Sequence, residues 1–190
     1  FTNNSIIKIK TNKKLIKFSY KKSKNLNIKI LQTGENTQTG GRILRARNEI
    51  GSEKFFLTYG DCLADINIHK LLKFHNKSKK IATVTGVNPK TQYGALSIKN
   101  NLVTKFSEKP YVKDNFISGG FFVLSEKIFD LIKDDTTILE RKPMETLVKK
   151  KELSCYQHKG FWHPMDSLRD KRNLEKLWKN NRAPWKKFIK

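Results

Sequence analysis

The amino-acid sequence predicts an α/β protein with a mixed or parallel sheet and helices on its faces. Short apolar runs of strand type alternate along the chain with segments whose apolar residues recur at helical spacing. The run FFLTY at residues 55–59 is nearly continuous in apolar character, which is typical of a strand covered on both faces. No internal repeat or long linker interrupts this alternation, so 190 residues suit a single domain.

The first part of the chain is rich in predicted strands. Residues 6–9, 15–20 and 28–32 are apolar or alternating runs, and the Lys-rich residues 21–25 form a turn between the last two. A polar loop with glycines, residues 34–41, leads into a short predicted helix over residues 42–50.

Helices and strands alternate in the remainder. After the strand at 55–59, Ile68, Leu71, Leu72 and His75 lie at helical spacing and predict a helix over residues 66–75. The residues LysAsnAsn at 99–101 predict a hairpin turn, and Pro143 is suited to the first residue of a helix. The further predicted strands are 81–87, 94–98, 102–106, 119–124 and 153–158, and the further predicted helices are 126–133, 143–150 and 168–180.

Composition excludes several classes of protein. No apolar run is long enough to cross a bilayer, and residues 1–20 are broken throughout by Lys and Asn, unlike a signal peptide. The chain has two cysteines, Cys62 and Cys155, without the spacing of a metal site. We therefore expect a protein of the reduced cytoplasm, with no membrane partner.

A formal charge of +23 raises the alternative of a nucleic-acid-binding protein. Such proteins gather Lys and Arg on one face together with recognisable motifs. Here Lys is spread over the whole chain among many Asn and Ile residues, which AT-rich codon usage would also produce, and no such motif occurs. We expect no nucleic-acid partner, although an anionic small-molecule substrate would suit this charge.

The segment TQTGGRILRA contains paired glycines immediately before a predicted helix. Glycines allow backbone N–H groups to approach a ligand, and a helix N-terminus attracts anions. The alternative is a plain turn, which is commoner for this pattern.

Carboxylates follow two apolar segments. Asp61 ends the strand run in TyrGlyAsp, where open α/β sheets place ligands, and Asp65 is interpreted as the cap of the following helix. Asp166 follows GFWHPM and has the alternative role of N-cap for the helix near Leu168. Because Mg²⁺ binds through one or two carboxylates together with phosphates and waters, Asp61 and Asp166 are candidate ligands of one ion.

The segment FSEKP places Lys109 at the end of a strand, with Pro110 stopping the ladder. In so basic a chain, a solvated lysine is the ordinary interpretation of this residue.

These segments together resemble the sugar-1-phosphate nucleotidyltransferases. The residues that carry the likeness, in order, are GENTQTGGRILRA, FFLTYGDCLADINI, FSEKP, ISGGFFVL and GFWHPMDSLRDK. TGGRI, GFWHPMDSLRD and the ending RAPWKKF resemble the cytidylyl branch. The resemblance runs from about residue 28 to residue 187 and implies a mixed, mostly parallel Rossmann-like sheet with helices on both faces.

The resemblance also implies site residues and substrates. Asp61 and Asp166 correspond to the Mg²⁺ ligands, and Lys109 to the residue that holds the sugar phosphate. The remaining implied substrate-binding residues are Thr39, Arg42, Gly60, Glu108, Gly119 and Gly120. The implied reaction transfers a cytidylyl group from CTP to glucose 1-phosphate, giving CDP-glucose and pyrophosphate, and a homo-oligomer is expected at full length. No cysteine or histidine nucleophile is required, so Cys62, Cys155 and His163 are interpreted as structural.

The sequence departs from the family at its start, where the glycine-rich opening loop is absent, and at Cys62, where the family has a small residue. We therefore expect an N-terminally truncated piece of a longer protein that is inactive and prone to association on its own. Two alternatives remain open: a catalytically silent binding or regulatory module, and a basic nucleic-acid-binding domain.

Overall fold

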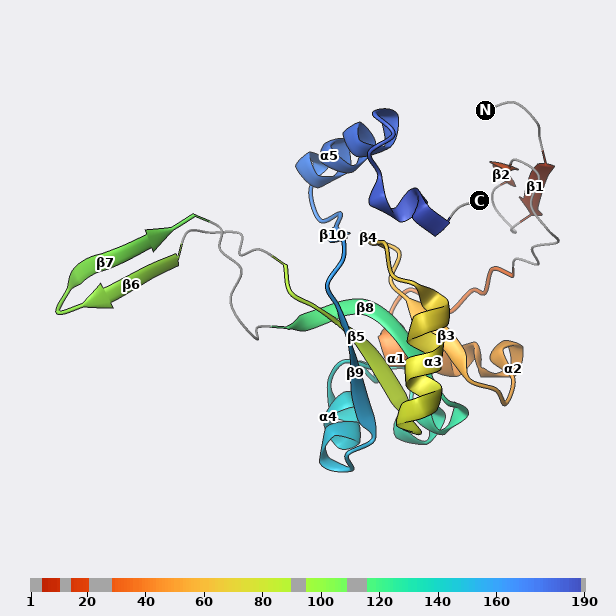
Figure 1. Cartoon of the computed structure of the whole chain (residues 1–190). Helices are drawn as coiled ribbons and strands as arrows, with labels where there is room; N and C mark the ends of the chain where they lie inside the picture. Colours follow the sequence, from red (N-terminus) through yellow and green to blue (C-terminus); the bar gives the residue numbers. More distant parts are fainter. Residues whose placement is uncertain (1–4, 11–14, 21–28, 90–94, 109–115, 189–190) are drawn as a thin grey trace. The chain divides into compact units, whose positions relative to one another are not determined.

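The computed structural model describes residues 5–10, 15–20, 29–89, 95–108 and 116–188 (Figure 1). The chain divides into two compact units, Phe1–Gln32 and Thr33–Lys190. In the first unit, β1 (Ser5–Lys10) pairs antiparallel with β2 (Leu15–Tyr20), which confirms both predicted strands. The strand predicted at residues 28–32 is wrong where it is described, because residues 29–32 are irregular and pair with no other described strand.

A mixed sheet with the strand order β3-β8-β5-β9 organises the second unit. β3 (Phe55–Thr58) and β5 (Ala82–Val87) both run antiparallel to β8 (Ile117–Leu124), while β5 and β9 (Leu153–His158) run parallel. The mixed sheet is confirmed. Three of its four strands share one direction, but β8 runs against them and lies between two of them, so most neighbouring pairs are antiparallel.

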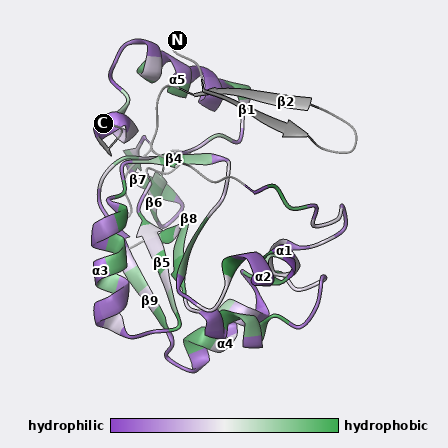
Figure 2. Ribbon diagram, turned by 90° about the vertical axis from the view of Figure 1, so that its right-hand side faces the viewer, coloured by the Kyte–Doolittle hydropathy of each residue, from purple (hydrophilic) through white to green (hydrophobic). Residues whose placement is uncertain are grey.

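Helices cover both faces of this sheet. Successive side chains of β8 point to opposite faces, and since they are apolar on both, each face needs a covering layer. Phe122 and Leu124 pack with a cluster that also includes Ile43, Ile128 and Leu147. These come from α1 (Thr39–Arg45), the 3₁₀ helix η1 (Glu126–Leu131) and α4 (Lys142–Lys149). On the other face, Val123 packs against Leu71 of α3 (Ile68–Ser78), and Figure 2 shows α3 beside β9.

Three predictions about single elements are corrected. The strand at 55–59 is not covered on both faces: Phe55 and Leu57 pack into the core, whereas the side chain of Phe56 is 47% exposed at the edge of the described sheet. The helix expected at 126–133 is the shorter 3₁₀ helix η1. The helix expected at 42–50 begins earlier, at Thr39, and continues beyond Ala46 as α2 (Arg47–Ile50).

The hairpin predicted between β5 and β8 is confirmed. β6 (Ala95–Lys99) pairs antiparallel with β7 (Leu102–Ser107). Asn100 and Asn101 both have positive φ angles, of 49° and 62°, as a two-residue hairpin turn requires.

Three elements were not predicted: β4 (Cys62–Ala64), β10 (Trp162–Pro164) and the 3₁₀ helix η2 (Pro184–Phe188). β4 and β10 form a separate antiparallel pair, and α5 (Leu168–Lys179) follows β10. No helix among the described residues is long and apolar enough to cross a membrane.

Candidate active site

The unpredicted pair β4–β10 brings the two candidate metal ligands to one end of a ladder. Pro164 lies opposite Cys62, and the N–H of Met165 donates to the carbonyl oxygen of Asp61 over 2.7 Å. Asp166 follows Met165 directly, so Asp61 and Asp166 leave the same end of the two paired strands. The structure therefore brings together two residues that are about a hundred positions apart in sequence, as the hypothesis of a shared ion requires.

Neither of the helix-capping roles considered for nearby aspartates is present. Ser167, not Asp166, caps α5: its side chain accepts from the N–H of Asp170, and the Asp170 carboxylate accepts from the N–H of Ser167 in return. Asn67, not Asp65, caps α3 by accepting from the N–H of Lys70. The interpretation of Asp65 as a cap is therefore wrong, because the helix begins later than expected and Asn67 holds the cap position.

The fold leaves the carboxylates of Asp61 and Asp166 available. Both are exposed, and neither side chain forms a hydrogen bond or ion pair with another described residue. Two such carboxylates fit Mg²⁺, which binds through one or two protein carboxylates and keeps several waters. No cluster of three or more metal-binding side chains occurs in the part of the chain that the structure describes, and a site of this kind needs none.

The two carboxylates act on the groups beside them. The pKa of the Cys62 thiol is raised by burial first and then by the negative charge of Asp61, with a smaller contribution from Asp166. The Cys62 thiol lies 3.7 Å from the carbonyl oxygen of Gly119, to which it donates a weak hydrogen bond. A half-buried thiol with a raised pKa is a poor nucleophile, which agrees with a structural role for Cys62.

Gly119 and Gly120 lie beside this ladder in a bulge of β8. The register between β5 and β8 shifts between Val84 and Gly86, and Gly120 has φ of 74°. The indole N–H of Trp162, in β10, donates to the carbonyl oxygen of Gly119 over 2.8 Å. A Cβ on Gly120 would lie 2.9 Å from the ring of Tyr59. The fold alone thus requires these glycines, and their role along the sugar stays a prediction.

Gly60 differs from them because its surroundings do not require a glycine. It lies in the turn between β3 and Asp61, and no described atom lies within 4 Å of the position that a Cβ would take. Backbone without a side chain is therefore exposed immediately beside Asp61, where a ligand can approach closely.

The TGGR segment, by contrast, packs against the protein itself. The N–H groups of Gly40 and Gly41 both donate to the carbonyl oxygen of Thr137, over 2.9 and 3.3 Å. The alternative that these two N–H groups are free to bind an anion, which the sequence left open beside a plain turn, is therefore wrong. A Cβ on Gly41 would lie 2.5 Å from the Cα of Asp135, so close contact between backbones explains this glycine.

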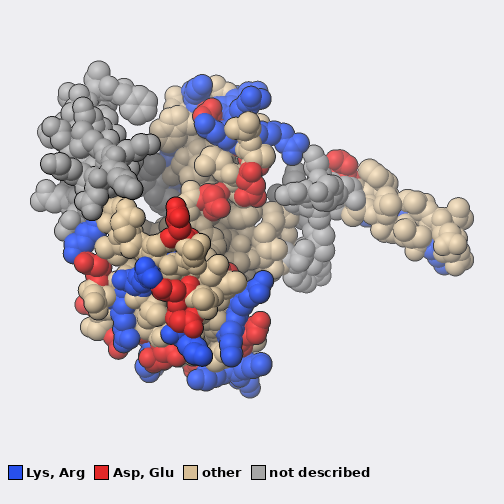
Figure 3. Space-filling view, turned by 180° about the vertical axis from the view of Figure 1, so that it is seen from behind, with Lys and Arg blue, Asp and Glu red and all other residues tan. Residues whose placement is uncertain are grey.

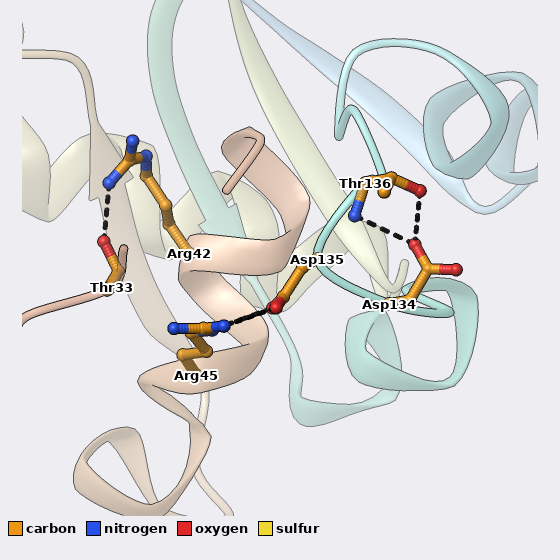
Figure 4. Close-up of polar contacts among 6 residues, drawn as sticks. All are labelled: Thr33, Arg42, Arg45, Asp134, Asp135 and Thr136. Carbon is orange, nitrogen blue, oxygen red and sulfur yellow. Dashed lines mark hydrogen bonds and ion pairs between the residues drawn. The ribbon is translucent and has the colours of Figure 1, made fainter. Parts of the chain in front are cut away.

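The arginines of α1 point to two different partners (Figure 4). Arg42 donates to the Thr33 hydroxyl over 2.6 Å. The Arg45 guanidinium donates through Nε and a terminal nitrogen to the two carboxylate oxygens of Asp135, over 2.8 and 2.5 Å. This guanidinium lowers the pKa of the Asp135 carboxyl. α1 is thereby fixed to the loop that precedes α4.

Glu140 is a residue of this region that no sequence pattern singled out. Its carboxylate accepts one hydrogen bond from the Thr39 hydroxyl, over 2.6 Å, and another from the Tyr59 hydroxyl. The pKa of Tyr59 is raised, first by burial and then by this bond to Glu140. Glu140 thus connects the start of α1 to the residue that precedes Gly60 and Asp61. Glu140 lies in the segment TILER at residues 137–141, which matches no motif that would mark a functional carboxylate.

The predicted sugar-phosphate segment is partly outside the described residues. Glu108 is exposed and follows β7, whereas Lys109 lies outside the described residues. On the face drawn in Figure 3, Lys and Arg side chains are spread over several separate areas, with acidic side chains between them.

Comparison with known proteins identifies the family. The family described as "Nucleotidyl transferase" matches residues 1–170. The glucose-1-phosphate cytidylyltransferase of Salmonella typhimurium is 42% identical over 168 residues, which are 88% of this chain and 65% of that protein. The probable glucose-1-phosphate cytidylyltransferase of Bacillus subtilis is 43% identical over 160 residues, which are 84% of this chain and 63% of that protein.

The chain thus spans less than two thirds of the length of these relatives. Among solved structures, UDP-glucose pyrophosphorylase complexed with UDP-glucose matches with a TM-score of 0.59 at 18% identity, over 80% of this chain and 66% of that one. A putative glucose-1-phosphate thymidylyltransferase from Bacillus anthracis matches with a TM-score of 0.54 at 16% identity, over 74% and 61%. These two likenesses show the fold, and the family match shows that the chain belongs to the nucleotidyl transferase family of enzymes.

Proposed function

We propose that the full-length protein transfers a cytidylyl group from CTP to glucose 1-phosphate, giving CDP-glucose and pyrophosphate. The observation that carries this proposal is the pair Asp61 and Asp166, placed at one end of the β4–β10 ladder without a described protein partner. The cytidylyltransferases that share 42% and 43% of aligned residues support the choice of substrates.

In the proposed reaction, a phosphate oxygen of glucose 1-phosphate attacks the α-phosphorus of CTP. The bond from this phosphorus to the oxygen that bridges to the β-phosphate breaks, and pyrophosphate leaves with that electron pair. The nucleophile is already an anion, so the protein needs no general base and contributes mainly positioning and charge stabilisation.

Each residue of the site has a role in this proposal. Asp61 and Asp166 would hold Mg²⁺, which supplies positive charge next to the phosphates when it is bound. The exposed backbone at Gly60 leaves room for the substrate beside Asp61. Lys109 would bind the sugar phosphate and Glu108 the sugar hydroxyls, while Thr39 and Arg42 would lie along the nucleotide; these roles rest on the family resemblance.

Pyrophosphate release by the full-length protein tests the proposal. We expect turnover that requires CTP, glucose 1-phosphate and Mg²⁺ together and that is lost in Asp61→Asn and in Asp166→Asn. Turnover that persists in both variants would contradict the assignment of these carboxylates, and no turnover with any sugar phosphate and nucleotide would favour a silent binding module.

Competition among CTP, UTP, dTTP and ATP tests the nucleotide separately. We expect preference for CTP, because the relatives at 42% and 43% identity are glucose-1-phosphate cytidylyltransferases, the second of them a probable one. Preference for dTTP would assign the protein to the thymidylyl branch. Cytoplasmic location and a homo-oligomeric state remain predictions of the same proposal.

A further inference from the structure

Asp65 and His158 form a cluster that the proposed reaction does not use. One oxygen of the Asp65 carboxylate accepts from the N–H of Phe161 over 2.7 Å and lies 3.0 Å from Nε2 of His158. The same imidazole nitrogen lies 3.1 Å from the carbonyl oxygen of Phe161, so a proton on Nε2 is shared between two acceptors. The N–H of Asp65 donates to that carbonyl over 3.1 Å, which closes the arrangement.

The cluster is sheltered and tightly packed. The side chains of His158 and Asp65 are 9% and 20% exposed. A Cβ on Gly160 would lie 2.3 Å from the Asp65 carboxylate and 2.7 Å from the His158 ring, so a larger residue would force the two apart. Hydrogen bonds to a charged, sheltered carboxylate are worth more than ordinary ones.

The position of this cluster relative to the ladder gives it a consequence for the site. β4 and β10 are only three residues long each, and they pair over Cys62–Ala64 and Trp162–Pro164. Asp65 and Phe161 bond at one end of this ladder, and Asp61 and Met165 bond at the other. A ladder this short has little stability of its own, so its ends decide whether it forms.

We propose that Asp65 and His158 are positioning residues for the cation site. Their contacts with each other and with Phe161, called the clasp below, hold the far end of the β4–β10 ladder together and thereby keep Asp166 beside Asp61. The inference rests on the proposed function for the cation, but the geometric part stands on the β4–β10 contacts alone.

Binding of Mn²⁺ to the full chain, followed by the electron paramagnetic resonance signal of the free ion, tests the cation part. Loss of a residue that orients a metal ligand typically weakens metal binding about 10–100-fold. We expect a loss in that range for Asp65→Ala and a smaller loss for Asp65→Asn, which keeps an acceptor for the Phe161 N–H. His158→Gln should also lose less than Asp65→Ala.

Glu152→Gln is the matched control. Glu152 is also a part-buried carboxylate, 31% exposed, that accepts from a backbone N–H, that of Ile81, over 3.2 Å. It lies just before β9, at the opposite end of that strand from His158. We expect its Mn²⁺ affinity to equal that of the unaltered protein.

Amide hydrogen exchange at Met165 tests the geometric part without any metal. In Asp65→Ala we expect exchange at this N–H to accelerate at least about tenfold, since opening of the ladder releases its bond to Asp61. Exchange there should be unchanged in Glu152→Gln. If Asp65→Ala does not fold, Asp65→Asn and His158→Gln decide the question by the same two measurements.

The outcomes separate the two proposals. Mn²⁺ affinity and Met165 exchange that are the same in the Asp65 and Glu152 variants would overturn the clasp. If the unaltered protein binds no Mn²⁺, or binds it equally well in Asp166→Asn, the cation site fails, and Met165 exchange alone then decides whether the clasp exists.

Discussion

Gly60 and Gly41 both lie in segments that the sequence predicts to meet the substrate, yet their surroundings are opposite. A side chain on Gly60 would meet no described atom within 4 Å, whereas one on Gly41 would lie 2.5 Å from the backbone of Asp135. Beside Gly60, the Asp61 carboxylate has no described partner; beside Gly41, the Thr39 hydroxyl and the guanidinium of Arg42 are both hydrogen-bonded within the protein.

The difference shows that a glycine in such a segment can be required either by packing within the protein or by the approach of a ligand. At the TGGR segment, the fold itself explains both glycines and occupies their N–H groups. At the TyrGlyAsp turn, no described contact requires the missing side chain or occupies the exposed carboxylate, and binding of a ligand there stays a prediction. The predictions below test this division.

The largest effect should follow from the carboxylates. We expect Asp61→Asn to reduce pyrophosphate release by the full-length protein by more than the roughly 10–100-fold that loss of an orienting partner causes, because a direct ligand is lost. Asp134→Asn is the control, since Asp134 is an exposed carboxylate held by local bonds to Thr136. Equal losses in the two variants would break the comparison.

Stability should distinguish the two glycines. Gly41→Ala forces its Cβ against the backbone of Asp135 and should lower the free energy of unfolding by about 1–3 kcal/mol or more, as overpacking does. Gly60→Ala should change the free energy by less than about 1 kcal/mol in either direction. Urea unfolding of both variants measures this, and a loss at Gly60 as large as that at Gly41 would contradict an open site there.

The hydrogen bond from Tyr59 to Glu140 connects the two compared segments, and we expect its loss to have only a small effect on stability. Tyr59→Phe removes the hydroxyl that donates to Glu140 but keeps the ring, whose centroid lies 5.9 Å from that of Phe122. We expect the free energy of unfolding to fall by about 0.5–1.5 kcal/mol, the usual net value of one hydrogen bond. A loss of several kcal/mol would show that Tyr59 supports more of the site than this bond.

A buried polar cluster in the core should give the smallest effect and should depend on pH. His75 is buried and lies 2.8 Å from the Thr83 hydroxyl, and its pKa is lowered from 6.5, first by burial and then by Lys54. A lowered histidine pKa contributes stability that is present above pH 6.5 and is lost as the pH falls below it toward the folded-state pKa.

We expect a decrease of less than about 1.4 kcal/mol in the free energy of unfolding for the first pH unit below that value. His75→Asn should remove this part of the dependence, as urea unfolding between pH 7.5 and 5.5 can measure. A dependence that survives the substitution would have another origin.

The sequence predicted most of the fold because its signals are local. Periodic apolar residues gave α3, Pro143 marked the start of α4, and the asparagines at 100 and 101 gave the hairpin turn. η1 differs from its prediction because apolar spacing does not distinguish a 3₁₀ helix from a short α-helix.

The site was predicted only in its separate residues. Asp61 and Asp166 follow recognisable segments, but β4 and β10 are too short for a periodic signal, so their pairing could not be predicted. Asp65 was assigned the cap role wrongly because Asp and Asn cap a helix about equally well. The sequence therefore could not show that the cap of α3 is Asn67, two residues later. The actual partners of Asp65, Phe161 and His158, are distant in the chain and become neighbours only through the β4–β10 pair.

The central claim is that the open end of the β4–β10 ladder binds a divalent cation and that the TGGR segment does not. Paramagnetic broadening of backbone amide resonances by a small amount of Mn²⁺ tests it residue by residue in the full chain. We predict that the amides of Gly60, Cys62 and Ser167 broaden before those of Gly40 and Gly41, and that Asp166→Asn abolishes the effect. Broadening centred on Gly40 and Gly41, or unchanged broadening in Asp166→Asn, would contradict the account.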